Sequence, residues 1–537
     1  MSPNIQSLVR YFSLFPLNME ALLILSALLS LVFYLVLHKY TRTYSRLPLP
    51  PGPKGLPIIG NIFSLPPNGV PEYEHWLKFK DLYGPISSIT VLGRTLVILH
   101  DRKAVDELLE KMSTKTSSRP ENTFSNMSGF NRFVVNMQYG AQWRQHRKVL
   151  HQYLGTEKLA RRFDDVQDME SRRLLLRLLT SPENLVQHFK TEAGAIILRA
   201  TYGYAIEPHS PDPLVQAIEE MMNNLSKSTV PLSWAVDVIP ALRFLPNFLP
   251  GTSFKQTAKE AYAINDLVTD VPYQFVQQEM AKGAHRPSFV SSSLTENKHS
   301  NGKEGTDHDA ESVIKVVAAI MYGGGADTTV AVLTGFVLAM ILFPKVQQQA
   351  QEELDRVLGD KLPDAEDQNN LPYVSAVVKE AMRWFPIAPV NTPHATDAEI
   401  QYGGYRIPKG SYILASTWWL LHDPQVYQDP NAFDPDRFLL RNEPEPTNAM
   451  FGFGRRICPG RFVAEKSLFI TIARLLSTFT VRKGAGEAKR VFTPGLIAHP
   501  AEFSYEITPR SEKHAAYVRA IERDVPWEKG DSGLLSR

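Results

Sequence analysis

Apolar residues are distributed unevenly along the chain, and the densest group lies near the N-terminus. Residues 21–37 read ALLILSALLSLVFYLVL, without a single charge. At about 1.5 Å per helical residue this run spans about 26 Å, enough for the hydrocarbon core of a thin bilayer. The basic residues His38, Lys39, Arg42 and Arg46 follow it directly. We therefore expect a short lumenal N-terminus at 1–20, a transmembrane helix at 21–37 and a cytoplasmic remainder.

A basic and proline-rich linker is expected at 38–53. Pro50, Pro51 and Pro53 favour an extended, stiff segment that would orient the following body, residues 54–537, against the membrane. The alternative interpretation of the N-terminus is a cleaved signal peptide. It fits less well because the basic residues follow the apolar run and no small-residue cleavage site appears.

Beyond the linker, strand-like and helix-like patterns occur in one body. Alternating apolar residues around Gly93 predict a strand hairpin, and a polar stretch at 282–311 predicts a solvated loop. The residues from about Ser511 are charged and expected to be peripheral. The pattern predicts a mainly α fold with a smaller β part (α+β), with helices dominating 101–343, a long apolar helix at 311–342, amphipathic helices at 348–358 and 373–384, and strands within 86–99, 403–417 and 492–508.

Composition narrows the possible partners and compartment. A net charge of +2 gives no signal for nucleic-acid binding. The chain contains one cysteine, so a disulfide-stapled secreted fold is excluded and a reduced compartment is favoured.

That cysteine, Cys458, lies in the loop FGFGRRICPG at 451–460. A lone thiol can be a buried apolar filler, a nucleophile or the axial ligand of a haem iron. Gly454 and Gly460 permit close approach of a flat ligand, and the neighbouring Arg456 favours a thiolate. No histidine base lies nearby in the sequence, which disfavours the nucleophile.

The loop resembles the haem-binding signature of the cytochromes P450, Phe-x-x-Gly-x-Arg-x-Cys-x-Gly, at every defined position. The resemblance implies a cytochrome P450 fold and haem b (iron protoporphyrin IX). It also implies that Cys458 is the axial thiolate, that Arg456 binds a haem propionate and that Phe451 shields the sulfur.

A second motif stands on the long apolar helix, where Gly323, Gly324 and Gly325 precede Ala326, Asp327 and Thr328. Each glycine inside a helix costs about 1 kcal/mol relative to alanine, so a close approach or a local opening is expected there. The alternative is a kinked core helix. The segment looks like the oxygen-activation motif of the family, which implies that Thr328 hydrogen-bonds dioxygen and that Asp327 relays protons.

Glu380 and Arg383 share one helix face, where the simplest interpretation is a weak surface ion pair. In the family this pair is the Glu-x-x-Arg motif, which binds a further arginine, implied here to be Arg437. Asp436 replaces the more usual glutamate beside that arginine. The implied role of these three residues is structural.

Three more residues have implied contacts with the haem propionates. Trp143 and Arg147 are one helical turn apart and match the Trp-x-x-x-Arg motif of the family. His394 matches a further propionate-contacting position, although a lone histidine is more often a satisfied core or surface residue.

The motifs follow the order of the family over residues 48–510 and look most like fungal microsomal members of secondary metabolism. This implies a single-pass protein of the endoplasmic reticulum that uses O2 and an NADPH–cytochrome P450 reductase, with cytochrome b5 as a further electron donor. It also implies oxidation of a lipophilic small molecule, such as a terpenoid, in a pocket lined from 117–135, 318–327, 387–392 and 496–498. Arg119 and Arg132 could meet an acidic group there, but loop arginines are expected to be solvated.

Two alternatives to a haem-thiolate monooxygenase remain at this point. One is a haem-thiolate isomerase or dehydratase that needs no external electrons. The other is a non-catalytic membrane-anchored haem protein. The intact Asp327-Thr328 pair disfavours both.

Overall fold

The computed structural model describes residues 26, 27, 30, 47–300 and 307–535. The N-terminal segment 1–20 and the part of the linker before Leu47 lie outside the described residues. So does the expected transmembrane helix at 21–37, apart from Ser26, Ala27 and Ser30.

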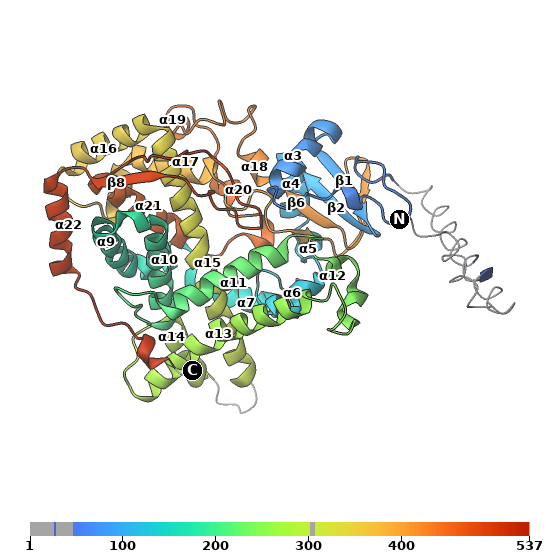
Figure 1. Ribbon diagram of the computed structural model, residues 1–537, viewed down its shortest axis with the longest axis horizontal. Helices are drawn as coiled ribbons and strands as arrows, with labels where there is room; N and C mark the ends of the chain where they lie inside the picture. Colours follow the sequence, from blue (N-terminus) through green and yellow to red (C-terminus); the bar gives the residue numbers. More distant parts are fainter. Residues whose placement is uncertain (1–25, 28–29, 31–46, 301–306, 536–537) are drawn as a thin grey trace, which may run out of the picture. The chain divides into compact units, whose positions relative to one another are not determined.

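Helices make up most of the described residues (Figure 1). The longer ones are α3 (Glu72–Tyr83), α7 (Ala141–Leu154), α9 (Asp164–Thr180), α10 (Leu185–Tyr202), α11 (Pro213–Thr229), α13 (Phe254–Ala281), α14 (Phe289–Ser300), α15 (Asp307–Leu342), α16 (Pro344–Leu358), α17 (Pro372–Trp384), α21 (Arg461–Thr478) and α22 (Glu512–Asp524). The shorter ones are α4 (Arg102–Val105), α5 (Ser113–Thr116), α6 (Thr123–Met127), α8 (Glu157–Ala160), α12 (Ala235–Val238), α18 (Thr417–Leu420), α19 (Asp436–Leu439) and α20 (Thr447–Met450). A π-helical turn, η2 (Asp106–Lys111), follows α4, and 3-10 turns occur at η1 (Ile62–Ser64), η3 (Phe130–Arg132), η4 (Arg161–Phe163), η5 (Pro182–Asn184), η6 (Pro240–Phe244), η7 (Ala365–Asn370), η8 (Gly454–Arg456) and η9 (Ser532–Leu534).

The β part contains a four-stranded sheet in the order β1-β2-β6-β3. Its first two strands, β1 (Ile86–Val91) and β2 (Arg94–Leu99), form the hairpin that the pattern around Gly93 predicts. The β2 strand then pairs in parallel with β6 (Tyr412–Ala415), which pairs antiparallel with β3 (His394–Ala395). A separate antiparallel pair joins β7 (Phe479–Lys483) to β8 (Tyr505–Pro509).

The hairpin of β4 (Ile400–Tyr402) and β5 (Tyr405–Ile407) belongs to a separate small unit with residues 47–50. Its two-residue turn consists of Gly403 and Gly404, both with positive φ, as a tight hairpin turn requires. The Arg406 N–H donates to the Pro48 carbonyl at 2.8 Å.

The long apolar helix predicted at 311–342 is α15, which begins slightly earlier, at Asp307. Among the described residues, its segment Ala310–Leu342 alone has the length and hydropathy of a membrane span, but 72% of its most apolar window is buried in the protein. Val317 packs in one apolar cluster and Phe336 in the other large one. The helix is apolar all round because it runs through the core, beside α10 (Figure 1).

Two predictions about polar segments were wrong. The stretch 282–311 is not a continuous loop, because Phe289, Val290 and Leu294 are buried on one face of α14. The residues after Ser511 are not peripheral, because Ala515, Val518 and Ile521 form the buried stripe of α22. In both helices a narrow apolar stripe is hidden by a strongly polar composition.

Candidate active site

The loop before α21 holds Cys458, which is a lining residue of an internal cavity. The Cys458 N–H donates to the Phe451 carbonyl at 2.8 Å. Gly454 has a φ of +57°, and a Cβ there would lie 2.1 Å from the Leu109 carbonyl oxygen, so the loop packs directly on η2. Burial raises the pKa of the Cys458 thiol, while the Gly460 N–H and the Arg147 charge act in the opposite direction.

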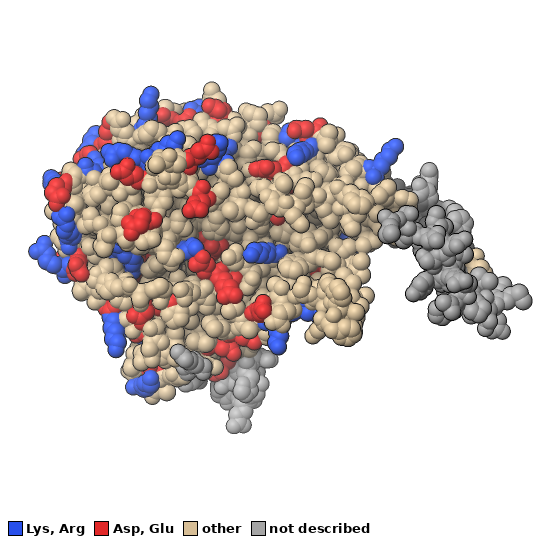
Figure 2. Space-filling model, in the orientation of Figure 1, with Lys and Arg blue, Asp and Glu red and all other residues tan. Residues whose placement is uncertain are grey.

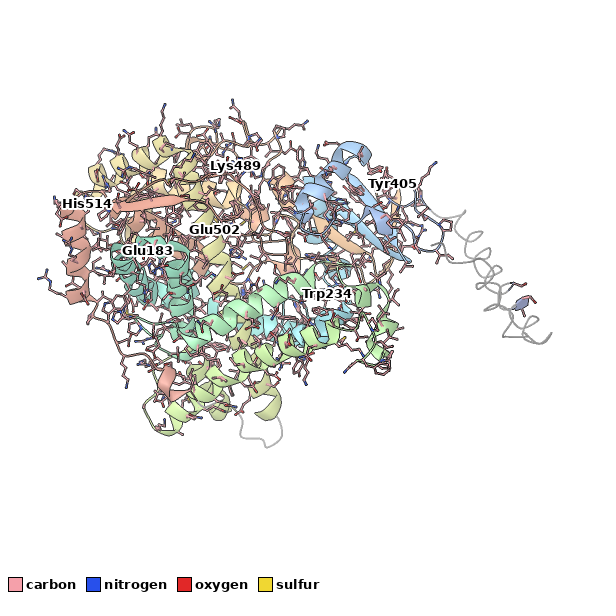
Figure 3. All side chains as sticks on the ribbon, viewed as in Figure 1. Glu183, Trp234, Tyr405, Lys489, Glu502 and His514 are labelled. Atoms are coloured by element: carbon pink, nitrogen blue, oxygen red, sulfur yellow. The ribbon has the colours of Figure 1, made fainter. Side chains whose placement is uncertain are left out.

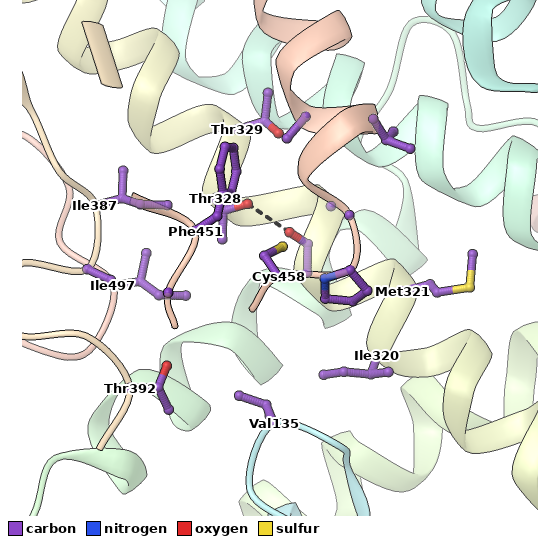
Figure 4. Close-up of a pocket in the computed structure, with 18 of the residues that line it drawn as sticks. Val135, Ile320, Met321, Thr328, Thr329, Ile387, Thr392, Phe451, Cys458 and Ile497 are labelled. Atoms are coloured by element: carbon purple, nitrogen blue, oxygen red, sulfur yellow. Dashed lines mark hydrogen bonds between the residues drawn. The ribbon is translucent and has the colours of Figure 1, made fainter. Parts of the chain in front are cut away.

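The cavity has a volume of about 320 Å³ and lies between the Cys458 loop and α15. Figure 4 shows Cys458 and Thr328 at this space, with apolar side chains from several segments around them. Each of the four expected segments contributes to the lining: Arg119, Val134 and Val135; Ile320, Met321, Gly324 and Gly325; Ile387, Ala388, Asn391 and Thr392; Leu496 and Ile497.

The three glycines of α15 have different neighbours. A Cβ on Gly323 would lie 3.0 Å from Met222 Sδ, and one on Gly325 would lie 2.3 Å from Ile197. These two glycines therefore permit close packing of α15 on α11 and α10. Gly324 has open space at its Cβ position and lines the cavity, so its missing side chain leaves room for a bound group. The helix continues through all three glycines.

Three arginines line the cavity: Arg119 and Arg456 are buried, and Arg147 is half-buried. Arg456 donates to the carbonyls of Ser117, Val134 and Met137 at 2.6–2.8 Å, and burial next to Arg119 and Arg147 lowers its pKa to about 7. Among the described residues, none of these three guanidiniums forms an ion pair with a carboxylate. Burial likewise lowers the pKa of Arg119 to about 9.

Trp143 and His394 line the same cavity as these arginines. The Arg456 guanidinium stacks over the Trp143 ring at 4.7 Å, and the buried Trp143 Nε1 has no hydrogen-bond partner among the described residues. His394 Nδ1 lies 2.8 Å from the Thr116 carbonyl, and burial keeps the pKa of this imidazole well below its usual range.

The structure separates Asp327 from Thr328. Thr328 lines the cavity, and its hydroxyl donates to the Gly324 carbonyl at 2.8 Å. Asp327 is not among the lining residues. Instead its Oδ1 lies 3.1 Å from Nε2 of His499.

Comparison with known proteins identifies the family. The sequence model of cytochrome P450 matches residues 50–507. This chain belongs to the cytochrome P450 family. It is 46% identical to cytochrome P450 monooxygenase CLM2 of Gibberella zeae, over 95% of this chain and 97% of that protein. It is 43% identical to multifunctional cytochrome P450 monooxygenase af510 of Aspergillus fumigatus (95% and 97%) and 40% identical to cytochrome P450 monooxygenase ppsD of Aspergillus oryzae (91% and 94%). The predicted oxygen-incorporating oxidoreductase is thereby confirmed.

Haem with a cysteine ligand is the cofactor of this P450 family, and the cavity fits it. A haem carries two carboxylates. Among the described residues, the cavity offers the buried Arg119 and Arg456 and the half-buried Arg147, none paired with a carboxylate, and a Trp143 indole N–H without a partner. The thiol of Cys458 supplies the soft ligand that the iron of a haem-thiolate protein requires. The open face at Gly324 lets a flat group lie against α15.

Behind the Cys458 loop, this P450 has a fully buried charge network. Glu380 accepts from Arg383 Nε at 2.7 Å and from Arg437 Nε at 3.1 Å, with all three side chains inaccessible. Glu380 also accepts from the N–H of Asp434 at 2.9 Å, which fixes the segment just before Arg437. The Glu380–Arg383 pair is therefore buried, and it is not the weak surface ion pair that the simplest interpretation of the sequence predicts.

Several residues at the site differ from expectation or were missed. Arg119 is not solvated, since it is buried and donates to the carbonyls of Val135, Thr392 and Pro393. Arg132 instead pairs with Asp266 at 2.7 Å, outside the cavity lining. Glu192 and His499 were missed, because their neighbours come from distant parts of the sequence and neither belongs to a local motif.

Proposed function

We propose that this P450 oxidises a lipophilic small molecule, such as a terpenoid or a related natural-product intermediate of fungal secondary metabolism. The observation that carries the proposal is the apolar wall of the cavity on the Thr328 side. Ile320, Met321, Ile387, Leu496 and Ile497 line it and bring no charge to it. The curated relatives are fungal P450 monooxygenases, which supports this class of reaction.

The proposed roles of the side chains follow from their positions. Bound haem supplies the chemistry by which O2 and two electrons insert one oxygen atom into the substrate. Arg119, Arg147, Arg456, Trp143 and His394 bind and orient the propionates, and Phe451 shields the Cys458 sulfur. The Thr328 hydroxyl offers a hydrogen bond on the cavity side of α15, and Asp327, its neighbour in the sequence, would relay protons.

We further propose attachment to the endoplasmic reticulum through residues 21–37. Exposed aromatic residues support contact with a membrane surface, since Phe63 and Phe248 are 84% and 83% exposed. Phe244 lies in η6, directly after α12, and the region around α12 carries few charged side chains in Figure 2.

The proposed electron donor is a membrane-bound NADPH–cytochrome P450 reductase, with cytochrome b5 as a further donor. Arg144, Lys148 and Arg455 are exposed and could meet an acidic partner. Arg147, on the same helix as Arg144 and Lys148, instead lines the cavity and donates to the Ile457 carbonyl.

The test is a reduced, CO-bound spectrum of the full-length protein in membranes, with Cys458→Ala as the matched variant. We expect a Soret band at about 450 nm in the wild type and none in the variant. NADPH-dependent oxidation of candidate terpenoids with the reductase then identifies the substrate. Conversion of a terpenoid without NADPH would show an isomerase or dehydratase instead, and absence of the band would contradict any haem-thiolate function.

A further inference from the structure

The loop at 492–500 forms part of the cavity wall through Leu496 and Ile497. Its two ends meet in a β-bridge between Phe492 and Pro500. Inside that bridge, the Thr493 N–H donates to the His499 carbonyl and the His499 N–H donates to Thr493 Oγ1, both at 2.9 Å. These bonds give the loop a defined conformation between β7 and β8.

Other elements hold the same loop from three sides. The Gly495 N–H donates to the Glu72 carboxylate of α3 at 3.0 Å, and the Ile497 N–H donates to Ser226 Oγ of α11 at 3.2 Å. The Ala498 N–H donates to the Ile387 carbonyl at 2.8 Å. The backbone around the lining residues is therefore fixed by partners from three other segments of the chain.

The fourth contact is the one between His499 and Asp327 of α15. His499 Nε2 lies 3.1 Å from Asp327 Oδ1, with the two side chains 31% and 20% exposed. Neither side chain lines the cavity, whereas Ile497, two residues before His499, and Thr328, directly after Asp327, both do. Histidine is the side chain best suited to exchange protons near neutral pH.

We propose that His499 positions the Asp327 carboxyl and supplies protons to it. The loop at 492–500 then belongs both to the cavity wall and to the proton relay. The proposal rests on the proposed monooxygenase function. In the step, the Nε2 proton of protonated His499 passes to Asp327 Oδ1, leaving neutral imidazole and carboxylic acid. The imidazole then regains a proton from a hydronium ion of the solvent, which leaves water, so one proton enters for each one delivered and no electron moves.

Without proton delivery, reduced oxygen leaves as hydrogen peroxide instead of being carried on to water. NADPH, H⁺ and O2 give NADP⁺ and H2O2, whereas two NADPH, two H⁺ and O2 give two NADP⁺ and two H2O. The fraction of consumed NADPH that appears as peroxide therefore reports proton delivery, and it needs no identified substrate.

The experiment compares His499→Phe and His499→Gln with the wild type, using the full-length haem-loaded protein, reductase, NADPH and O2. We expect both variants to keep the 450 nm band and to release about threefold more peroxide per NADPH. We also expect a larger solvent isotope effect on NADPH consumption. Hydrogen exchange of the amides at 493–500 is the second readout: it should rise in His499→Phe and stay near the wild type in His499→Gln, which keeps a hydrogen-bond donor.

His514→Gln is the matched control, because His514 is a partly exposed histidine on α22, away from the cavity, whose Nδ1 lies 2.8 Å from Ser511 Oγ (Figure 3). It should match the wild type in all three readouts. If both His499 variants show the peroxide fraction and the isotope effect of the wild type, the proposal is overturned. This holds even if hydrogen exchange rises, since His499 would then only tether the loop. A wild type that shows the 450 nm band but consumes no NADPH with reductase would instead overturn the proposed function, and this inference with it.

Discussion

Glu192 shows how strongly the surroundings of a single residue can change its chemistry in this protein. It lies on α10 at the edge of the cavity, is almost completely buried and accepts from Thr471 Oγ1 at 2.8 Å. Burial raises its pKa to about 8, so the carboxyl is largely protonated at neutral pH in the folded state. In the unfolded chain the same group titrates near 4.3, the ordinary value of glutamate.

This difference predicts a pH dependence of stability. The folded state binds the extra proton, so the contribution of Glu192 is intact below about pH 4 and is progressively lost as the pH rises toward about 8. The Glu192→Gln variant keeps a hydrogen-bonding side chain without a charge. We expect its free energy of unfolding, relative to that of the wild type, to be higher at pH 8 than at pH 5.5. The gain should be of order 2 kcal/mol. Thermal unfolding of both proteins at the two pH values measures it, and a pH-independent difference would contradict the assignment.

At the residue scale, sequence reasoning found side chains that carry a local motif, such as Cys458 among its glycines and Thr328 on a glycine-containing helix. It missed Glu192 and His499, and it placed Arg119 in solvent. The environment of each of these is created by segments far away in the sequence. Arg119, for instance, is buried because its guanidinium reaches the carbonyls of Thr392 and Pro393.

At the scale of secondary-structure elements, the buried network of Glu380, Arg383 and Arg437 joins two helices of the protein. It links α17 to α19, and α19 stands before the loop that carries Cys458. A buried charge that loses its partner typically costs 3–5 kcal/mol, far more than the pair itself contributes. The network therefore fixes the relative position of these elements.

The corresponding prediction is that Arg437→Ala lowers the free energy of unfolding by about 4 kcal/mol and reduces haem content. Arg441→Ala is the matched control. Arg441 pairs with Glu443 at 2.8 Å, as Arg437 does at 2.6 Å, but its side chain is 30% exposed. Its removal should cost less than about 1 kcal/mol. Chemical unfolding and the absorbance of bound haem measure both variants, and equal losses would argue against the role of burial.

Secondary structure was predictable where one pattern dominated a segment. The helix at 373–384 and the hairpin around Gly93 agree closely with α17 and the β1–β2 pair. The helices α14 and α22 were not foreseen, because their buried stripes consist of only a few residues among many polar ones. The pairing of β2 with β6 could not be predicted from a local pattern either, because more than 300 residues separate Leu96 from Tyr412.

At the scale of the whole molecule, the C-terminal segment closes the chain onto helices from its first half. The Trp527 ring lies 5.6 Å from the Arg173 guanidinium and 5.1 Å from the Arg177 guanidinium. Glu528 accepts from Arg199 at 3.1 Å, and Asp531 accepts from the Ala205 N–H at 2.8 Å. This segment is therefore part of the folded body, although the family match ends at residue 507.

We accordingly expect Trp527→Ala to lower the free energy of unfolding by about 2 kcal/mol, through lost packing and two cation–π contacts. Leu534→Ala is the control, since Leu534 lies in the same segment but is 45% exposed. Its effect should stay within about 0.5 kcal/mol. Thermal unfolding distinguishes the two, and a stability of Trp527→Ala equal to that of the control would show that the segment is only loosely attached.

The presence of one cysteine in 537 residues has a practical consequence. Because that thiol faces the cavity, a maleimide or iodoacetamide reagent can modify this protein at one place only, and a ligated sulfur resists alkylation. The mass spectrum of a treated sample therefore gives the fraction of molecules without haem, because only these molecules gain the mass of the reagent. The same scarcity makes the protein a ready background for spin labels or fluorophores, since a cysteine introduced anywhere on the surface would be the sole reactive thiol of the loaded enzyme.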